Sequence, residues 1–231
     1  RSVEMSGITE DQMKKISVFF FSCILSLNLF SQNSEEAKLL LDAVSEKMGA
    51  YENMYIQFSQ TLINEEAGIQ KGDEPPIIGN ITLQQEKYNL DYLGNTFIFD
   101  GKKMYVINND EKEVTISDGD IDGDDGFIYP SKLLTFHKEG YTYAMGKLKK
   151  IKRKKIQFVT LYPIDSESNI VEVQLAIDTT TKHIYQLIQL GENNSKTTFT
   201  ITQFESNQNL SDTLFSLNRE KYSETNGYSI D

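Results

Sequence analysis

Histidine is the side chain that most often serves as a general base or a zinc ligand, and the chain has two, His137 and His183. Neither lies in an HExxH motif, which would place two zinc ligands on one helical face. The chain also lacks the GxSxG element of hydrolases, a P-loop and a GxGxxG fingerprint. A Ser-His-Asp triad assembles in space, so a hydrolase would require a carboxylate and a hydroxyl around one of these histidines. No spacing favours such a cluster, and we therefore expect a protein that is not an enzyme.

Carboxylates that could bind calcium occur at Asp118, Asp120 and Asp122, followed by Gly123. This spacing matches the first half of an EF-hand loop, but the twelfth position, which needs a bidentate glutamate, is Tyr129. No pair of amphipathic helices flanks the loop. We expect a solvated acidic loop over residues 118–126, with weak calcium binding left open, and we expect no resident metal or cofactor.

A run of seven cationic side chains lies between Lys147 and Lys155, in a chain whose formal net charge is −11. The pattern favours an exposed hairpin with charged strand edges. The functional alternatives are contact with anionic lipid headgroups or with an acidic protein partner. The acidic balance of the whole chain argues against a nucleic-acid partner, because phosphate binding requires an excess of Lys and Arg.

The bulk composition indicates one globular domain. The chain has 231 residues, of which 39% are hydrophobic and 25% charged. Its one cysteine, Cys23, excludes intramolecular disulfides and Cys-based zinc sites.

The segment Met13–Gln32 has the layout of a secretory signal peptide: Lys14 and Lys15, then an apolar run over Ile16–Phe30, then polar residues. We expect residues 1–32 to be removed, with Met13 as the initiator after an over-extended start. An uncleaved anchor is the alternative. The run is interrupted and short for a membrane span of about 20 apolar residues. Export would place the protein in the periplasm.

The remaining chain predicts one helix followed by short strands. Ala37, Leu40, Leu41, Val44 and Met48 form one helical face within 33–51, and Asn33 is the expected N-cap. The period then changes to two, which predicts strands at 55–63, 79–84, 87–92, 96–99, 103–107, 113–116, 142–144, 156–161, 170–177, 183–190 and 197–204. A second helical piece is expected over 130–140, and the polar tail 219–231 is expected to be loose.

These elements predict a mostly β fold with an α lid: a single antiparallel, strongly curved incomplete β-barrel covered by short helices. A sheet of about ten strands tends to curl, and its inner face can enclose a cavity. Aromatic side chains on the predicted strands could fill a core or line such a cavity; both interpretations remain open.

Several short motifs, in their order along the chain, resemble the periplasmic outer-membrane lipoprotein carrier family (LolA-like proteins). The matching residues are Phe58-Ser59-Gln60, then Gly79, Ile81 and Leu83, then Tyr88, Leu90 and Tyr92, then Asp100-Gly101 with Tyr105, then Leu161-Tyr162-Pro163, then Ile177-Asp178, Phe204 and Asp212 to Phe215. The resemblance covers residues 33–218, which we take as the carrier domain. Better-known members carry an Arg-Pro pair that helps to hold the lid closed, whereas this chain has Gln84-Gln85-Glu86-Lys87.

The resemblance implies a carrier that shields lipoprotein acyl chains in an apolar cavity and takes them from the inner to the outer membrane. It implies an inner-membrane lipoprotein-releasing transporter as one partner and an outer-membrane acceptor that the sequence does not identify. The residues expected at the cavity and lid are Leu40, Leu41, Val44, Phe58, Tyr88, Tyr92, Phe97, Phe99, Leu133, Leu134, Phe136 and Phe199. The alternative is a non-catalytic lipid- or protein-binding sensor module on the same scaffold.

Overall fold

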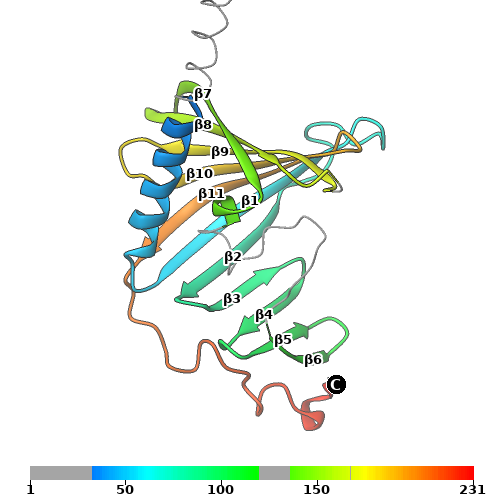
Figure 1. Cartoon of the computed structure of the whole chain (residues 1–231). Coiled ribbons are helices and arrows are strands. Elements are labelled where there is room, and N and C mark those ends of the chain that lie inside the picture. Colours follow the sequence, from blue (N-terminus) through cyan, green and yellow to red (C-terminus); the bar gives the residue numbers. More distant parts are fainter. Residues whose placement is uncertain (1–32, 120–135, 167) are drawn as a thin grey trace, which may run out of the picture.

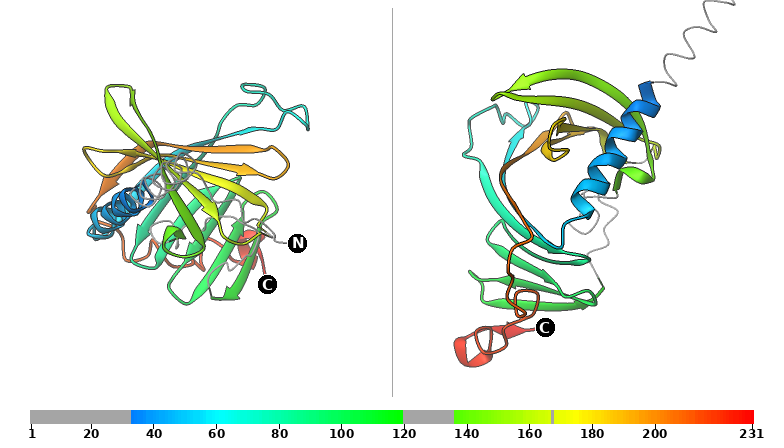
Figure 2. Two further views of the ribbon diagram at one scale, coloured as in Figure 1. Left: turned by 45° about the horizontal axis from the view of Figure 1, so that its top comes forward. Right: turned by 90° about the vertical axis from the view of Figure 1, so that its left-hand side faces the viewer.

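The computed structural model describes residues 33–119, 136–166 and 168–231, and in these residues the protein is one strongly curved β-sheet with one α-helix (Figure 1). The helix runs through residues 33–49 and lies against the concave side of the sheet (Figure 2). Within the described part of the chain, no helix is long and apolar enough to cross a membrane.

The helix buries the face that its sequence predicts. Ala37, Leu41, Val44 and Met48 are at most 4% exposed, whereas Leu39 is 60% exposed. Asn33, the expected N-cap, instead has helical backbone, and its side-chain amide contacts the backbone of Met145 on a distant strand.

Twelve strands make up the sheet. They are β1 (Met54–Ile63), β2 (Ile77–Gln84), β3 (Lys87–Tyr92), β4 (Asn95–Phe99), β5 (Lys103–Asn108), β6 (Glu113–Asp118), β7 (Tyr141–Ile151), β8 (Lys154–Pro163), β9 (Ile170–Asp178), β10 (Ile184–Gly191), β11 (Lys196–Ser206) and β12 (Ser229–Ile230).

The strands follow the order β12-β6-β5-β4-β3-β2-β1-β11-β10-β9-β8-β7, so β12 and β7 are the two edges. In the part of the chain that the structure describes, the sheet is therefore open and strongly curved, which confirms the expected single curved sheet and confirms the expected barrel shape only in part. Neighbours are antiparallel except for β12, which pairs with β6 in parallel. Meander connections join β2 to β6 and β7 to β11, and the long pairing of β1 with β11 brings these two halves together.

Tight turns set the register of the meanders. In the β4–β5 turn, one carboxylate oxygen of Asp100 accepts hydrogen bonds from the backbone N–H groups of Lys102 and Lys103, both at 2.8 Å. The Tyr105 hydroxyl donates to the other oxygen at 3.0 Å. Burial alone would raise the pKa of Asp100, but these donors hold it below its ordinary value. Gly101 completes this turn with φ +94°, a backbone conformation that favours glycine.

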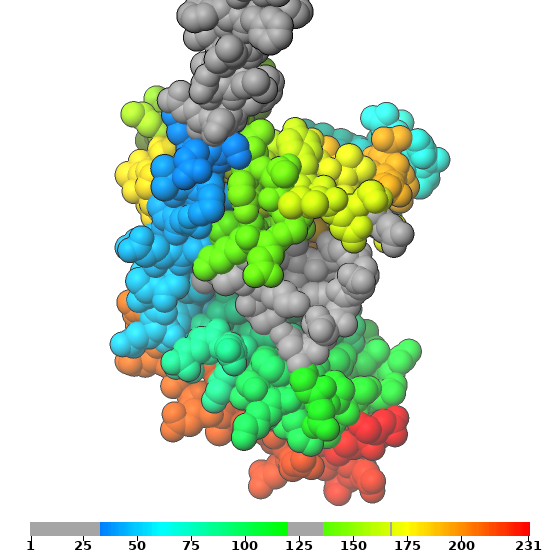
Figure 3. Space-filling model, viewed as in Figure 1, coloured from blue at the N-terminus to red at the C-terminus, as the bar shows by residue number. Residues whose placement is uncertain are grey.

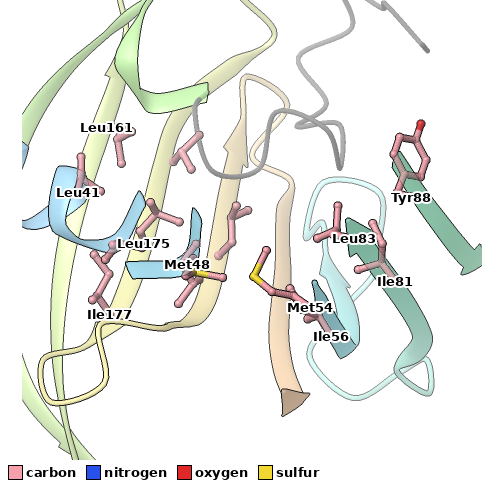
Figure 4. Packing of buried hydrophobic residues seen from close by; sticks show 14 of the residues in the cluster. Leu41, Met48, Met54, Ile56, Ile81, Leu83, Tyr88, Leu161, Leu175 and Ile177 are labelled. Atoms are coloured by element: carbon pink, nitrogen blue, oxygen red, sulfur yellow. The ribbon is translucent and has the colours of Figure 1, made fainter. Parts of the chain in front are cut away.

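The main core lies on the concave face. Alternate residues of each strand point into it, as Val173, Leu175 and Ile177 do on β9, all at most 2% exposed. Figure 4 shows Leu41 and Met48 of the helix on the same side as the side chains of β8 and β9, with residues of β1 and β2 continuing the apolar surface. One apolar layer thus extends across most of the sheet.

A second, smaller cluster lies on the opposite face of β4 to β6, where the C-terminal segment packs. It consists of Ile98, Tyr105, Ile107, Val114 and Tyr222, each at most 8% exposed. The tail after residue 218 is thus packed, and it ends in a strand, contrary to the expectation that it is loose.

The second helical piece, expected over residues 130–140, falls mostly outside the described residues. The described part is a short 3-10 turn, η2 (Phe136–Lys138). The predicted segment 1–32 and most of the acidic loop 118–126 also lie outside the described residues.

Candidate functional site

Ten of the twelve predicted site residues are described, and all ten belong to the main concave-face cluster. Leu41, Val44, Tyr88 and Phe99 are fully buried members. The partly buried members that pack against them are Leu40, Phe58, Tyr92, Phe97, Phe136 and Phe199. The other two, Leu133 and Leu134, lie outside the described residues. The structure thus brings side chains from one helix, four strands and one 3-10 turn, in both halves of the sheet, to one apolar surface.

Three aromatic rings form a row across this surface. The Phe58 ring on β1 lies 5.7 Å from the ring of Tyr92 on β3 and 5.8 Å from the ring of Phe199 on β11, measured between centroids. The Tyr92 hydroxyl donates a hydrogen bond to the side chain of Gln60, and burial raises the pKa of that hydroxyl. The row presents apolar ring surface to the concavity while its one hydroxyl has a partner on the sheet.

Gly79 leaves the space that the Phe58 ring occupies. The two residues pair across β1 and β2, and a Cβ atom on Gly79 would lie 2.4 Å from Cζ of Phe58. The ring therefore covers the glycine, and no larger residue fits beneath it. This contact supplies a physical reason for the phenylalanine and glycine motifs noted in the sequence.

Beneath the helix, the packing is close. The space enclosed by Leu41, Val44, Phe136, Leu175 and Ile184, with Ser45 and His137 at its rim, is about 10 Å³. A space of that size holds about one water molecule. An acyl chain can enter this part of the interface only if the helix moves.

His137 holds the middle of the helix to η2 and the start of β7, which pack directly against it (Figure 3). Its Nε2 atom lies 3.4 Å from the Ser45 hydroxyl and 3.8 Å from a carboxylate oxygen of Asp42. Asp42 also accepts a hydrogen bond from Lys38 at 2.8 Å. Burial lowers the pKa of His137, and the Asp42 carboxylate partly opposes that shift.

This cluster has the residue types of a hydrolase triad but a different arrangement. A triad requires the carboxylate at one imidazole nitrogen and the nucleophile at the other. Here Asp42 and Ser45 both approach Nε2, and His137 is only 4% exposed. The geometry is that of a contact between two elements.

His183 holds the end of the helical segment. Its Nε2 atom lies 2.8 Å from the Tyr51 hydroxyl, and its ring stacks on Phe204 at a centroid distance of 4.2 Å. Burial lowers the pKa of His183, and Lys47 adds to the effect. Sequence reasoning missed Asp42, Tyr51 and both histidines as anchors of the helix, because residues so far apart in the chain carry no spacing signal.

The position that matches the family's Arg-Pro pair is the β2–β3 turn in this chain. Gln85 occupies it with φ +55°, beside the exposed Glu86 and Lys87. The helix is held by its buried apolar face and by polar contacts, which include the two histidine contacts and the contact of Asn33 with Met145.

A larger, polar cleft lies outside the concave face. It measures about 580 Å³ and lies between the β2–β3 and β4–β5 turns and the segment 208–216, with Glu52, Lys87, Asp100 and Lys102 among its lining residues. Such a lining does not suit an acyl chain. Among the described residues, no group of three or more His, Cys, Asp or Glu side chains could hold a metal ion.

Solved structures that are similar to this chain share little sequence identity with it. An uncharacterized conserved protein from Thermus thermophilus superposes with a TM-score of 0.56 at 9% identity, over 85% of this chain and 99% of that chain. A putative outer membrane lipoprotein-sorting protein domain from Vibrio parahaemolyticus has a TM-score of 0.42 at 10% sequence identity, over 82% of this chain and 98% of that chain. The Mycobacterium tuberculosis lipoprotein LppX has a TM-score of 0.45 at 13% sequence identity, over 75% of this chain and 99% of that chain.

A comparison with curated protein sequences finds no match. The family model described as outer membrane lipoprotein carrier protein LolA matches residues 87–218, more than half of the chain. The matched range runs from β3 through β11 and beyond, and so includes most of the concave sheet. The chain belongs to the LolA family.

Proposed function

We propose that the protein is a periplasmic carrier that binds the acyl chains of lipoproteins between the helix 33–49 and the concave face of the sheet. The observation that carries this proposal is the continuous apolar layer on that face, which one helix covers in part. The LolA family model supports the same function.

The carrier role needs no covalent chemistry. Burial of an acyl chain against an apolar layer is favourable by about 0.8 kcal/mol for each CH₂ group that is removed from water. This binding free energy requires no covalent bond. In the cluster around His137, Asp42 and Ser45 both approach Nε2, which differs from the arrangement of a triad.

The path we propose starts at an inner-membrane lipoprotein-releasing transporter and ends at an acceptor on the outer membrane. Cargo would enter when the helix moves away from β8 to β10, because the space beneath it is too small for an acyl chain. Loading would then depend on the free energy of the two histidine contacts.

A second candidate is a non-catalytic module that recognises a protein partner through β7, which is an edge strand of the sheet in the described part of the chain. The exposed, cationic end of that strand favours it. This candidate predicts that the concave face stays filled by its own side chains.

Titration with a diacyl lipopeptide separates the two candidates. The carrier proposal predicts saturable binding of the lipopeptide and none of the same peptide without its acyl chains. Equal behaviour of the two peptides would favour the partner-binding module.

A further inference from the structure

The β7–β8 hairpin concentrates positive charge on an acidic protein. Seven of the 23 Lys and Arg residues of the chain lie between Lys147 and Lys155, and no acidic residue interrupts them. All seven are exposed. The yellow-green tip of this ribbon extends beyond its neighbouring strands in the left view of Figure 2. We call residues 147–155 the cationic hairpin.

Protection of a sheet edge explains only part of this charge. Lysines on β7, the edge strand, would prevent pairing with another chain. Lys154 and Lys155, however, lie on β8, which is not an edge strand, just before its pairing with β9 begins at Ile156. Lys152 and Arg153 form the turn, with φ values of +45° and +68°, where glycine or asparagine is favoured.

The cationic hairpin contains a cross-strand pair of like charges, which is electrostatically unfavourable. Lys150 and Lys155 are directly opposite each other across the two strands, and like charges in that position are destabilising. Among the described residues, the ion pair made by the hairpin is that of Lys154 with Asp178, at 3.7 Å. Most of the charge is thus available to a partner outside the molecule.

The charge is distributed in a way that fits a diffuse anionic surface. Alternation along β8 places Lys154 and Lys155 on opposite faces of the ribbon, and the turn residues lie at its tip. Six of the seven cations are Lys, which acts as a point charge, whereas planar recognition of a carboxylate favours Arg. Leu148, an apolar side chain among these lysines, is 59% exposed, as suits a headgroup interface.

We propose that the cationic hairpin docks the protein on the anionic phospholipid surface of a membrane. The inference rests on the proposed function in that a carrier must visit a membrane surface to load or deliver cargo. The acidic remainder of the molecule is repelled by the same surface, so the hairpin also sets the orientation in which the protein approaches. Asn33 contacts Met145 beside the hairpin, so the helix lies close to the docked end.

The test is co-sedimentation with vesicles of phosphatidylcholine, with and without phosphatidylglycerol. The soluble protein is purified from cells, and mass spectrometry of its N-terminus shows whether segment 16–30 is present. The triple variant Lys149→Gln, Lys150→Gln, Lys155→Gln removes three hairpin charges. The matched control, Lys71→Gln, Lys102→Gln, Lys196→Gln, removes three exposed lysines elsewhere.

We expect binding only to vesicles that contain phosphatidylglycerol, weakened about 100-fold in the hairpin variant, since each Lys near such a surface contributes about 1 kcal/mol. The control should bind like the wild type. Raising the ionic strength from about 0.1 M to about 1 M should abolish binding, because the Debye length falls from about 10 Å to about 3 Å. Absence of vesicle binding, or equal loss in both variants, would overturn the proposal and leave an acidic protein as the partner class.

Lipopeptide titration of the same variants keeps this inference separate from the carrier proposal. The hairpin variant should bind lipopeptide as the wild type does, because no hairpin residue belongs to the concave-face cluster. Vesicle binding without lipopeptide binding would reject the carrier and retain the docking surface. Lipopeptide binding without vesicle binding would do the reverse.

Discussion

At the scale of single residues, Gly79 is the described glycine at which an added Cβ atom would make the shortest contact, 2.4 Å from Phe58. Its backbone lies directly beneath the Phe58 ring, and that ring is the centre of the aromatic row with Tyr92 and Phe199. Sequence reasoning placed all four residues on strands, but the contact between Gly79 and Phe58 needs the register of β1 with β2, which no local pattern specifies.

We predict that Gly79→Ala lowers the free energy of unfolding by about 1–3 kcal/mol, because the added methyl group forces the Phe58 ring out of its place. Urea denaturation measures this change. Gly49→Ala is the matched control, since nothing lies within 4 Å of a Cβ there and its φ is not positive. Equal stability of the two variants would show that Phe58 does not rest on Gly79.

The two histidines predict a response to acid. Both have a pKa lowered by burial from the ordinary value of 6.5, so the unfolded chain binds their protons more tightly than the folded chain does. Their contribution to stability is present above pH 6.5 and is lost as the pH falls below it. The Asp42 carboxylate raises the pKa of His137, and Lys138 and Lys38 lower it.

We expect the unfolding free energy of the wild type to fall between pH 7 and pH 5, with a smaller fall in His137→Gln. Chemical denaturation at a series of pH values measures both slopes, and the difference between them removes the effect of carboxylates. A slope unchanged by the substitution would mean that His137 does not titrate in this range.

At the scale of elements, the sequence predicted the inner strands of the sheet well and the two edge strands, β7 and β12, poorly. Eleven predicted strands correspond to β1 through β11, because alternation of apolar residues on one face is a local signal. β7 was predicted only at 142–144 but runs through Tyr141–Ile151, because lysines on both faces of the cationic hairpin hide the alternation. β12 was missed, since two residues in parallel pairing with β6 have no pattern of their own.

The helix and the sheet depend on each other through the face that carries Leu41. We predict that Leu41→Asp lowers the unfolding free energy by at least about 3 kcal/mol and weakens lipopeptide binding, because it places a carboxylate in the main cluster. Leu39→Asp, on the exposed side of the same helix, should change stability by no more than about 0.5 kcal/mol. Similar effects of the two substitutions would contradict the assignment of the helix face.

The C-terminal segment belongs to the fold through Tyr222. We predict that Tyr222→Ala lowers the free energy of unfolding by about 3–5 kcal/mol, because the Tyr222 ring packs in the second cluster with Ile98 and Val114. The exposed Thr225→Ala serves as control in thermal unfolding. If Tyr222→Ala unfolds like the wild type, the segment 219–231 contributes nothing to the stability of the sheet.

At the scale of the whole molecule, the structure is an open curved sheet with an apolar inner face and a helix held there by two histidine contacts. The sequence predicted the curvature and the apolar inner residues, since both follow from strand number and alternation. It could not predict which strands form the two edges, because the places of β7 and β12 in the sheet depend on pairing between residues far apart in the chain.

The central claim is that this inner face binds acyl chains, and native mass spectrometry of the protein purified without detergent tests it most directly. The account predicts a bound diacyl or triacyl species, released as lipid on denaturation. A protein that is empty as purified, and that remains empty after incubation with a triacylated lipopeptide, would contradict it.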